Sequence, residues 1–211
     1  MIFENHEQGS AAWLAARAGV ITASEFETAT SKLTRKSGKK NAGDPTGEAE
    51  KYLAAVAIEI ISGKPFGDKF ETFAMRKGRD REPAARVAYE LRTGMIAEES
   101  GICFTDDKRF GYSTDGFVGD DGMVEIKCLS DSAKILLTHQ EGDVSEYLHQ
   151  MQGGMWITGR LWCDFILFVP ELESAGTDLY IKRVYRNEEF IEQLETDLLA
   201  ARDMVDRYER I

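Results

Sequence analysis

Residues 113–127 read Ser-Thr-Asp-Gly-Phe-Val-Gly-Asp-Asp-Gly-Met-Val-Glu-Ile-Lys, and this stretch decides the fold. Its Gly-Asp-Asp-Gly turn predicts that the chain reverses between two strands, and the second strand carries Glu125 and Lys127. Because strand side chains alternate between faces, these two side chains point the same way, and the apolar residues beside them point into a core. If Asp115 lies across the hairpin on the polar face, two carboxylates and one ammonium group meet at one place.

This combination of side chains suits phosphodiester hydrolysis. Two hard oxygen ligands can hold a magnesium ion, and a nearby lysine can orient and activate the attacking water. An ordinary solvent-facing hairpin is the competing interpretation, because acidic-x-Lys triplets are common in sequences. The triplet Asp106-Asp107-Lys108 is one such case, since it lies in a polar stretch between apolar runs and is interpreted as a solvated turn.

Composition predicts one globular domain over residues 1–211, with 43% hydrophobic and 30% charged residues. No apolar run approaches the ~20 residues that span a bilayer, so we expect no membrane association. The first residues lack the basic and apolar regions of a signal peptide. Cys103, Cys128 and Cys163 are odd in number and lie in apolar runs. They are interpreted as buried thiols of a cytoplasmic protein.

The net charge of −11 argues against a protein that coats nucleic acid with its whole surface. A local basic segment exists at residues 32–40, which hold five positive charges, among them Arg35, Lys36 and Lys39, and no acid. Two interpretations stay open for this segment: a solvated, mobile loop, or an arm that contacts phosphates.

Hydrophobic periodicity and turn residues predict a mixed α/β (α+β) protein. Thr22 to Glu25 fits a capping box at the start of a second helix. Pro83 is expected to open a helix at its first turn, which would place Glu82 at the N-terminal end of that helix. The predicted helices cover residues 9–18, 48–62, 145–158 and 187–209, and residues 68–93 are helical in pattern but interrupted by Gly78 and Pro83. The predicted strands cover 101–105, 110–118, 122–128, 161–169 and 178–186.

Several motifs in one order resemble the lambda-type (YqaJ-like) phage exonucleases, members of the PD-(D/E)XK nuclease superfamily. The matching segments are residues 13–25, 37–40, 78–82, 113–116, 125–128 and 149–158. The proline that precedes the catalytic aspartate in the family is Thr114 here. The resemblance implies a PD-(D/E)XK core at about 68–186, with a central mixed β-sheet flanked by helices and an N-terminal helical elaboration.

The resemblance also implies roles for individual residues. Glu82, Asp115, Glu125 and the carbonyl of Ile126 would bind magnesium, and Lys127 with Gln150 would position the water. A pocket for a terminal 5′-phosphate would hold Arg17, Ser24 and Ser113, because the planar arginine fork suits phosphate. Arg35, Lys36 and Lys39 would contact DNA. Met75 matches the position of an apolar wedge between the strands, and ordinary helix core is its competing interpretation.

By the same resemblance, the protein would be a magnesium-dependent 5′→3′ exonuclease of a phage or prophage, acting in the bacterial cytoplasm on duplex DNA ends. It would release mononucleotides and leave 3′ single-stranded tails for recombination. Two Mg²⁺ ions per site are implied, with Mn²⁺ substituting and Ca²⁺ not supporting cleavage. The implied partners are two further copies in a homotrimeric ring and a single-strand annealing protein. The alternatives are an endonuclease or resolvase of the superfamily and a non-catalytic DNA-end-binding module.

Overall fold

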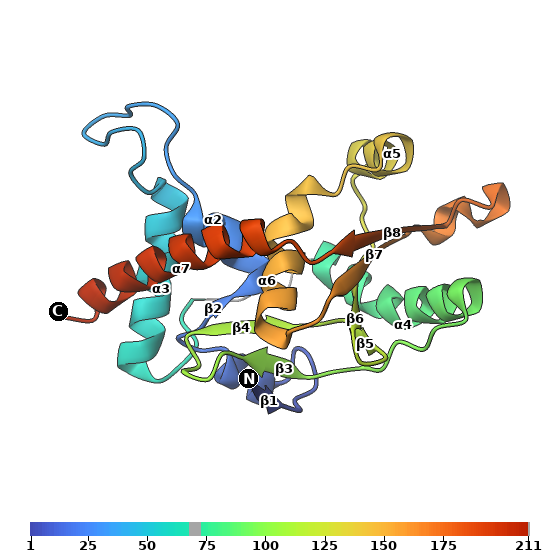
Figure 1. Cartoon of the computed structure of the whole chain (residues 1–211), viewed down its shortest axis with the longest axis horizontal. Coiled ribbons are helices and arrows are strands. Elements are labelled where there is room, and N and C mark those ends of the chain that lie inside the picture. Colours follow the sequence, from blue (N-terminus) through green and yellow to red (C-terminus); the bar gives the residue numbers. More distant parts are fainter. Residues whose placement is uncertain (68–72, 211) are drawn as a thin grey trace.

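The computed structural model of the chain describes residues 1–67 and 73–210, with side chains from Arg76 onward in the second range. Helices surround two mixed β-sheets, which confirms the predicted α/β class (Figure 1). The helices are α1 Ala11–Ala16, α2 Phe26–Thr30, α3 Gly47–Ser62, α4 Phe73–Thr93, α5 Ser132–Glu141, α6 Leu148–Thr158 and α7 Glu188–Tyr208. Three short 3-10 helices are also present: η1 Ala23–Glu25 before α2, η2 Ser145–Tyr147 before α6, and η3 Pro170–Ala175 between β7 and β8.

The two sheets each contain four strands. The first has the order β1-β3-β4-β2 and the second the order β5-β6-β7-β8. The parallel pairs are β2 with β4 and β6 with β7, and the other neighbouring strands are antiparallel. The strands are β1 Ile2–Glu4, β2 Ile21–Thr22, β3 Ile102–Phe104, β4 Phe110–Ser113, β5 Gly116–Val118, β6 Gly122–Lys127, β7 Trp162–Phe168 and β8 Leu179–Tyr185.

The predicted continuous strand over residues 110–118 was wrong, because the chain leaves one sheet after Ser113 and enters the other at Gly116. The Thr114 hydroxyl donates to the carbonyl oxygens of Gly116 (3.0 Å) and Val124 (3.3 Å). Such local side-chain bonds compete with a regular strand ladder. Asp115 therefore lies at the junction of the two sheets.

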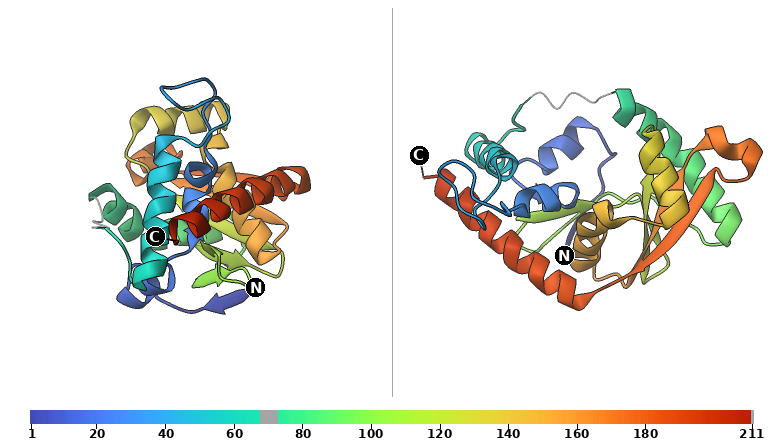
Figure 2. Two further views of the ribbon diagram at one scale, coloured as in Figure 1. Left: turned by 90° about the vertical axis from the view of Figure 1, so that its left-hand side faces the viewer. Right: turned by 90° about the horizontal axis from the view of Figure 1, so that it is seen from above.

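Pro83 lies inside α4 and not at its first turn, so the predicted helix start and the terminal position of Glu82 were both wrong. The α-helix continues through Pro83, although proline lacks the N–H group that would complete an i→i−4 hydrogen bond. Glu82 therefore lies near the middle of a long helix and not at its N-terminal end. In the view from above, α4 lies on the opposite side of the molecule from α3 (Figure 2).

Thr22 does not form the predicted capping box, since its side chain makes no capping hydrogen bond to η1. Its hydroxyl instead accepts a hydrogen bond from Arg17. The strands β1 and β2 and the helix α5 were absent from the prediction. The α5 helix begins after Asp131, whose carboxylate accepts from the backbone N–H groups of Ala133 and Lys134.

The alternation predicted for residues 122–127 is confirmed. Val124 and Ile126 are buried in a cluster with Tyr89 and Ile166, between α4 and the second sheet. A larger core lies under α2, α3, α6 and α7. The three cysteines are free thiols. Among the helices of the described residues, none is long and apolar enough to cross a membrane.

Candidate active site

One cavity brings together most of the predicted site. It has a volume of about 1060 Å³ and lies between the N-terminal helices α1 and α3 on one side and α4 on the other, with β4, β6 and α6 contributing to its wall. The predicted residues that line it are Arg17, Ser24, Glu82, Ser113, Asp115, Glu125, Ile126, Lys127 and Gln150. These residues are spread over more than 130 positions of the sequence, so they come together only when the chain folds.

Glu125 is the centre of a hydrogen-bond cluster. Its Oε1 atom accepts from Lys127 Nζ at 2.7 Å and from Gln150 Nε2 at 2.7 Å. Lys127 Nζ also donates to Gln150 Oε1 at 3.2 Å. The two residues on β6 thus point the same way, as the strand alternation predicted, and α6 supplies the amide. Lys127 Nζ lies 5.2 Å from the centre of the Tyr147 ring, which adds a cation–π contact.

Asp115 reaches the same place from the junction between the sheets. Its Oδ2 atom accepts from the backbone N–H of Ile126 at 2.7 Å, so its carboxylate lies across the hairpin beside the residue between Glu125 and Lys127. Arg86 of α4 donates to the Asp115 carbonyl oxygen at 3.0 Å. Asp115 is therefore held from both sides, by β6 and by α4.

The buried carboxylates repel one another. Burial, followed by the charges of Glu125 and Glu82, raises the pKa of Asp115 well above its usual value. Burial and then Glu125 raise the pKa of Glu82 as well. The carboxylates outweigh the burial of Lys127 and raise the pKa of its ammonium group, which stays charged. An added cation would relieve this repulsion between the acids.

The donor set fits a divalent cation in its chemistry. Asp115 and Glu125 are 9% and 1% exposed, and carboxylate and carbonyl oxygens are the ligands that magnesium takes in proteins. In residues 1–67 and 73–210, however, no three His, Cys, Asp or Glu side chains are grouped closely enough to hold one ion. Two carboxylates are thus in place, and Glu82 is near enough to act on both electrostatically.

A second part of the cavity contains Arg17 at the end of α1. Its guanidinium carbon lies 4.0 Å from the centre of the Trp13 ring, and its NH2 donates to Thr22 Oγ1 at 3.1 Å. Thr22 Oγ1 lies 3.4 Å from Ser24 Oγ. Trp13 Nε1 donates to Ser113 Oγ at 3.2 Å. Trp13 and Thr22 thus connect the three residues predicted for the phosphate pocket.

The remaining predicted residues lie elsewhere. Arg35, Lys36 and Lys39 are exposed on the long loop between α2 and α3, which projects from the body of the molecule (Figure 1), and they do not line the cavity. The loop is fastened near its base by an ion pair of 2.5 Å between Lys32 and Asp197. The side chain of Met75 lies outside the described residues.

Among the contributors to the site that were missed from the sequence are Thr22, Tyr112 and Arg86. Tyr112 donates from its hydroxyl to Glu125 Oε2 at 3.2 Å. Thr22 and Tyr112 lie within the segments that carry the family motifs or next to them, and that proximity was the available signal. Arg86 lies one turn after Glu82, at the i+4 position that shares a helix face.

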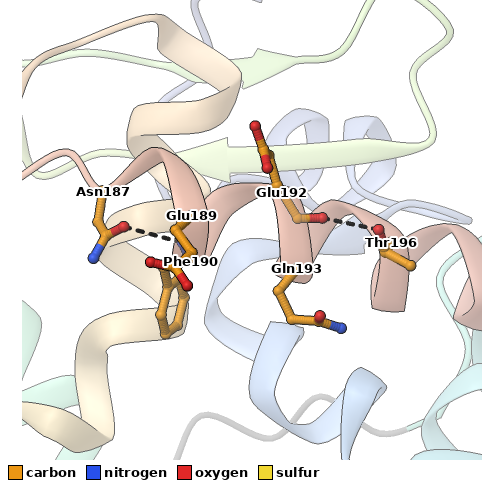
Figure 3. A pocket seen from close by; sticks show the side chains of 6 residues that line it. All are labelled: Asn187, Glu189, Phe190, Glu192, Gln193 and Thr196. Atoms are coloured by element: carbon orange, nitrogen blue, oxygen red, sulfur yellow. Dashed lines mark hydrogen bonds between the residues drawn. The ribbon is translucent and has the colours of Figure 1, made fainter.

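A second depression, with a volume of about 600 Å³, lies along the first half of α7. Figure 3 shows the side chains that line it. Asn187 Oδ1 accepts from the backbone N–H of Phe190, and Thr196 donates to the Glu192 carbonyl oxygen. None of the predicted site residues lines this depression. Its lining carries the carboxylates of Glu189 and Glu192, which would repel a phosphate.

Comparison with models of protein families shows which family this chain belongs to. The family model of the YqaJ-like viral recombinase domain matches residues 12–161, which contain every predicted site residue. The chain belongs to the YqaJ-like viral recombinase family. A search of curated proteins found no match.

Solved structures agree with membership in the YqaJ-like family. The alkaline exonuclease LHK-Exo from Laribacter hongkongensis is 30% identical, with a TM-score of 0.79 and coverage of 94% of this chain and 93% of that one. Its complex with dAMP gives a TM-score of 0.81 at the same identity and coverage. A phage-related exonuclease from Haemophilus somnus 129PT is 16% identical over 89% of this chain and 94% of its own, with a TM-score of 0.67, and shows the shared fold.

Proposed function

We propose that the protein is a divalent-metal-dependent exonuclease that degrades one strand of duplex DNA in the 5′→3′ direction. It would release mononucleotides and leave a 3′ single-stranded tail. The observation that carries this proposal is that one cavity holds both the Glu125–Lys127–Gln150 cluster with Asp115 and the separate group around Arg17. The first group suits hydrolysis, and the second suits recognition of a strand end.

The cluster around Glu125 supports a hydrolytic role. Asp115, Glu125 and the Ile126 carbonyl, joined by Glu82, would hold magnesium or manganese, with two ions per site; the bound metal would lower the pKa of water and stabilise the leaving oxygen. Lys127 would place its ammonium group against the attacking water and the developing negative charge. Gln150, which bonds both Glu125 and Lys127, would keep these side chains and the water in line.

Hydrolysis at the first internal phosphodiester would account for the group of residues around Arg17. Water attacks phosphorus and the P–O3′ bond breaks, so the released nucleotide keeps its 5′-phosphate. The new strand end again carries a 5′-phosphate. Arg17, with the hydroxyls of Ser24 and Ser113, would bind the terminal phosphate in every cycle through charge-assisted hydrogen bonds. An endonuclease acting on internal phosphates has no need of such a pocket.

DNA would reach the cavity past the basic loop. Arg35, Lys36 and Lys39 would contact phosphates there, which compensates locally for the overall charge of −11. Met75 would act as a wedge between the separating strands. We further propose that residues 1–211 work as one exonuclease domain within a homotrimeric ring in the host cytoplasm. A single-strand annealing protein would take over the 3′ tail.

A direct assay tests this proposal. Linear duplex, labelled at either the 5′ or the 3′ end, and closed circular duplex are incubated with magnesium, manganese or calcium. We expect acid-soluble nucleotides from linear DNA only, with the 5′ label released first and with no cleavage in calcium. Cleavage of the circle would support an endonuclease, and binding to ends without cleavage under any metal would support a non-catalytic module.

A further inference from the structure

Tyr112 connects the two sheets at the candidate site. It lies on β4 of the first sheet, and its hydroxyl donates to Glu125 Oε2 on β6 of the second sheet at 3.2 Å. Both residues are 1% exposed. The bond therefore crosses the junction at which Asp115 is placed, away from bulk water.

The carboxylate of Glu125 has a specific set of donors. Lys127 and Gln150 both bind Oε1, and Tyr112 is the donor to Oε2 in the described part of the chain. Two donors on Oε1 hold that oxygen in place, but the tilt of the carboxylate plane about it also depends on the position of Oε2. A third donor on the other oxygen restricts that rotation.

The ring of Tyr112 packs closely against α6. A Cβ atom added at Gly154 of α6 would lie 2.7 Å from two ring carbons of Tyr112 and 2.9 Å from the methyl carbon of Met123. A glycine thus permits the helix to pack directly on the ring. Fixed supporting groups of this kind hold a functional side chain in its productive orientation.

We propose that Tyr112 is a positioning residue for the reaction proposed above, on which this inference rests: its hydroxyl fixes the orientation of the Glu125 carboxylate that binds the divalent cation. The hydroxyl would act through Glu125. Groups that orient a metal ligand commonly contribute 10- to 100-fold to metal affinity or activity.

The chain offers a matched control for a purely structural role. Tyr89 is fully buried, and its hydroxyl donates to the buried carboxylate of Asp164 at 2.8 Å. Asp164 also binds Arg183 through both carboxylate oxygens, and neither Tyr89 nor Asp164 lines the cavity. Tyr112→Phe and Tyr89→Phe thus remove the same group from the same kind of bond, inside and outside the site.

The experiment measures Mn²⁺ binding by electron paramagnetic resonance, together with the Mn²⁺ dependence of DNA cleavage and the melting temperature. We expect Tyr112→Phe to weaken Mn²⁺ binding about tenfold and to raise the Mn²⁺ concentration for half-maximal cleavage by a similar factor. Tyr89→Phe should lower the melting temperature at least as much and leave Mn²⁺ binding within about twofold of the wild type.

The variant Asp115→Asn distinguishes the proposed metal site from the proposed positioning role of Tyr112. If Asp115→Asn loses Mn²⁺ binding and Tyr112→Phe binds like the wild type, the positioning role is wrong and the proposed metal site stands. If Asp115→Asn binds Mn²⁺ normally, the metal site itself is wrong. Equal weakening by Tyr112→Phe and Tyr89→Phe would show a general effect of destabilisation and would also overturn the positioning role.

Discussion

Replacement of Arg17 by alanine tests the part of the proposal that distinguishes an exonuclease. Arg17 is held in two ways: the Trp13 ring lies against its guanidinium carbon at 4.0 Å, and Thr22 Oγ1 accepts from its NH2 at 3.1 Å. Burial lowers the pKa of Arg17, yet an arginine keeps its charge at any physiological pH. The guanidinium has five N–H donors, and Thr22 occupies one of them. The others can serve a phosphate.

The magnitude follows from the bonds that would be lost. A hydrogen bond to a charged group contributes about 1.5–3 kcal/mol. At about 1.4 kcal/mol for each factor of ten, Arg17→Ala should lower kcat/KM on 5′-phosphorylated ends by roughly 10- to 150-fold. A 5′-hydroxyl end offers no terminal phosphate to bind. On such ends the mutant and the wild type should differ by less than about threefold, within the range of a neutral hydrogen bond.

The assay compares both proteins on duplexes that are identical except for the 5′-phosphate. Thr22→Val removes the acceptor that orients Arg17 and should cause a smaller loss with the same dependence on the phosphate. Arg109→Ala is the matched control, because Arg109 is exposed and pairs with Asp107 outside the cavity. If Arg17→Ala is impaired equally on both substrates, or on neither, Arg17 does not bind the terminal phosphate. The result would then favour the alternative that the protein is an endonuclease.

Three further outcomes are expected. Lys127→Ala should reduce cleavage by about 10²- to 10⁴-fold with DNA binding retained, and near-normal turnover by a folded variant would refute the site. Pro83→Ala should raise the free energy of unfolding in urea by about 1–2 kcal/mol, because α4 regains an i→i−4 hydrogen bond. An unchanged urea midpoint would contradict the cost assigned to the hydrogen bond that Pro83 cannot make. Burial lowers the pKa of His149 from 6.5. The unfolded chain therefore binds the proton first as the pH falls below 6.5, and stability should decrease there. His149→Leu should flatten that dependence in melting curves between pH 7 and 5.

The sequence predicted the hairpin and the direction of its side chains well, for a local reason. Strand alternation is a property of the backbone, so the common direction of Glu125 and Lys127 and the burial of Val124 and Ile126 follow from position alone. The same holds for α3, which ends at Gly63 in the left-handed conformation.

The errors came from interactions between distant residues. Pro83 reads locally as a helix start, but α4 extends on the N-terminal side of this proline, where Lys77 and Arg81 pair with Glu171 of η3. Thr22 reads as a cap, but Arg17 uses its hydroxyl. The partner that such a hydroxyl finds is fixed by tertiary structure and not by the local sequence.

The break between the two sheets explains how the site can form from ordinary elements. A continuous strand from residue 110 to residue 118 would have kept Tyr112 and Asp115 in one sheet. The Thr114 hydroxyl instead fastens the junction to Val124 of β6, the residue before Glu125. Consequently the carboxylate of Asp115 and the hydroxyl of Tyr112 reach the same strand of the other sheet, at Ile126 and Glu125. Thr114 thus helps to place Asp115 beside the strand that carries Glu125.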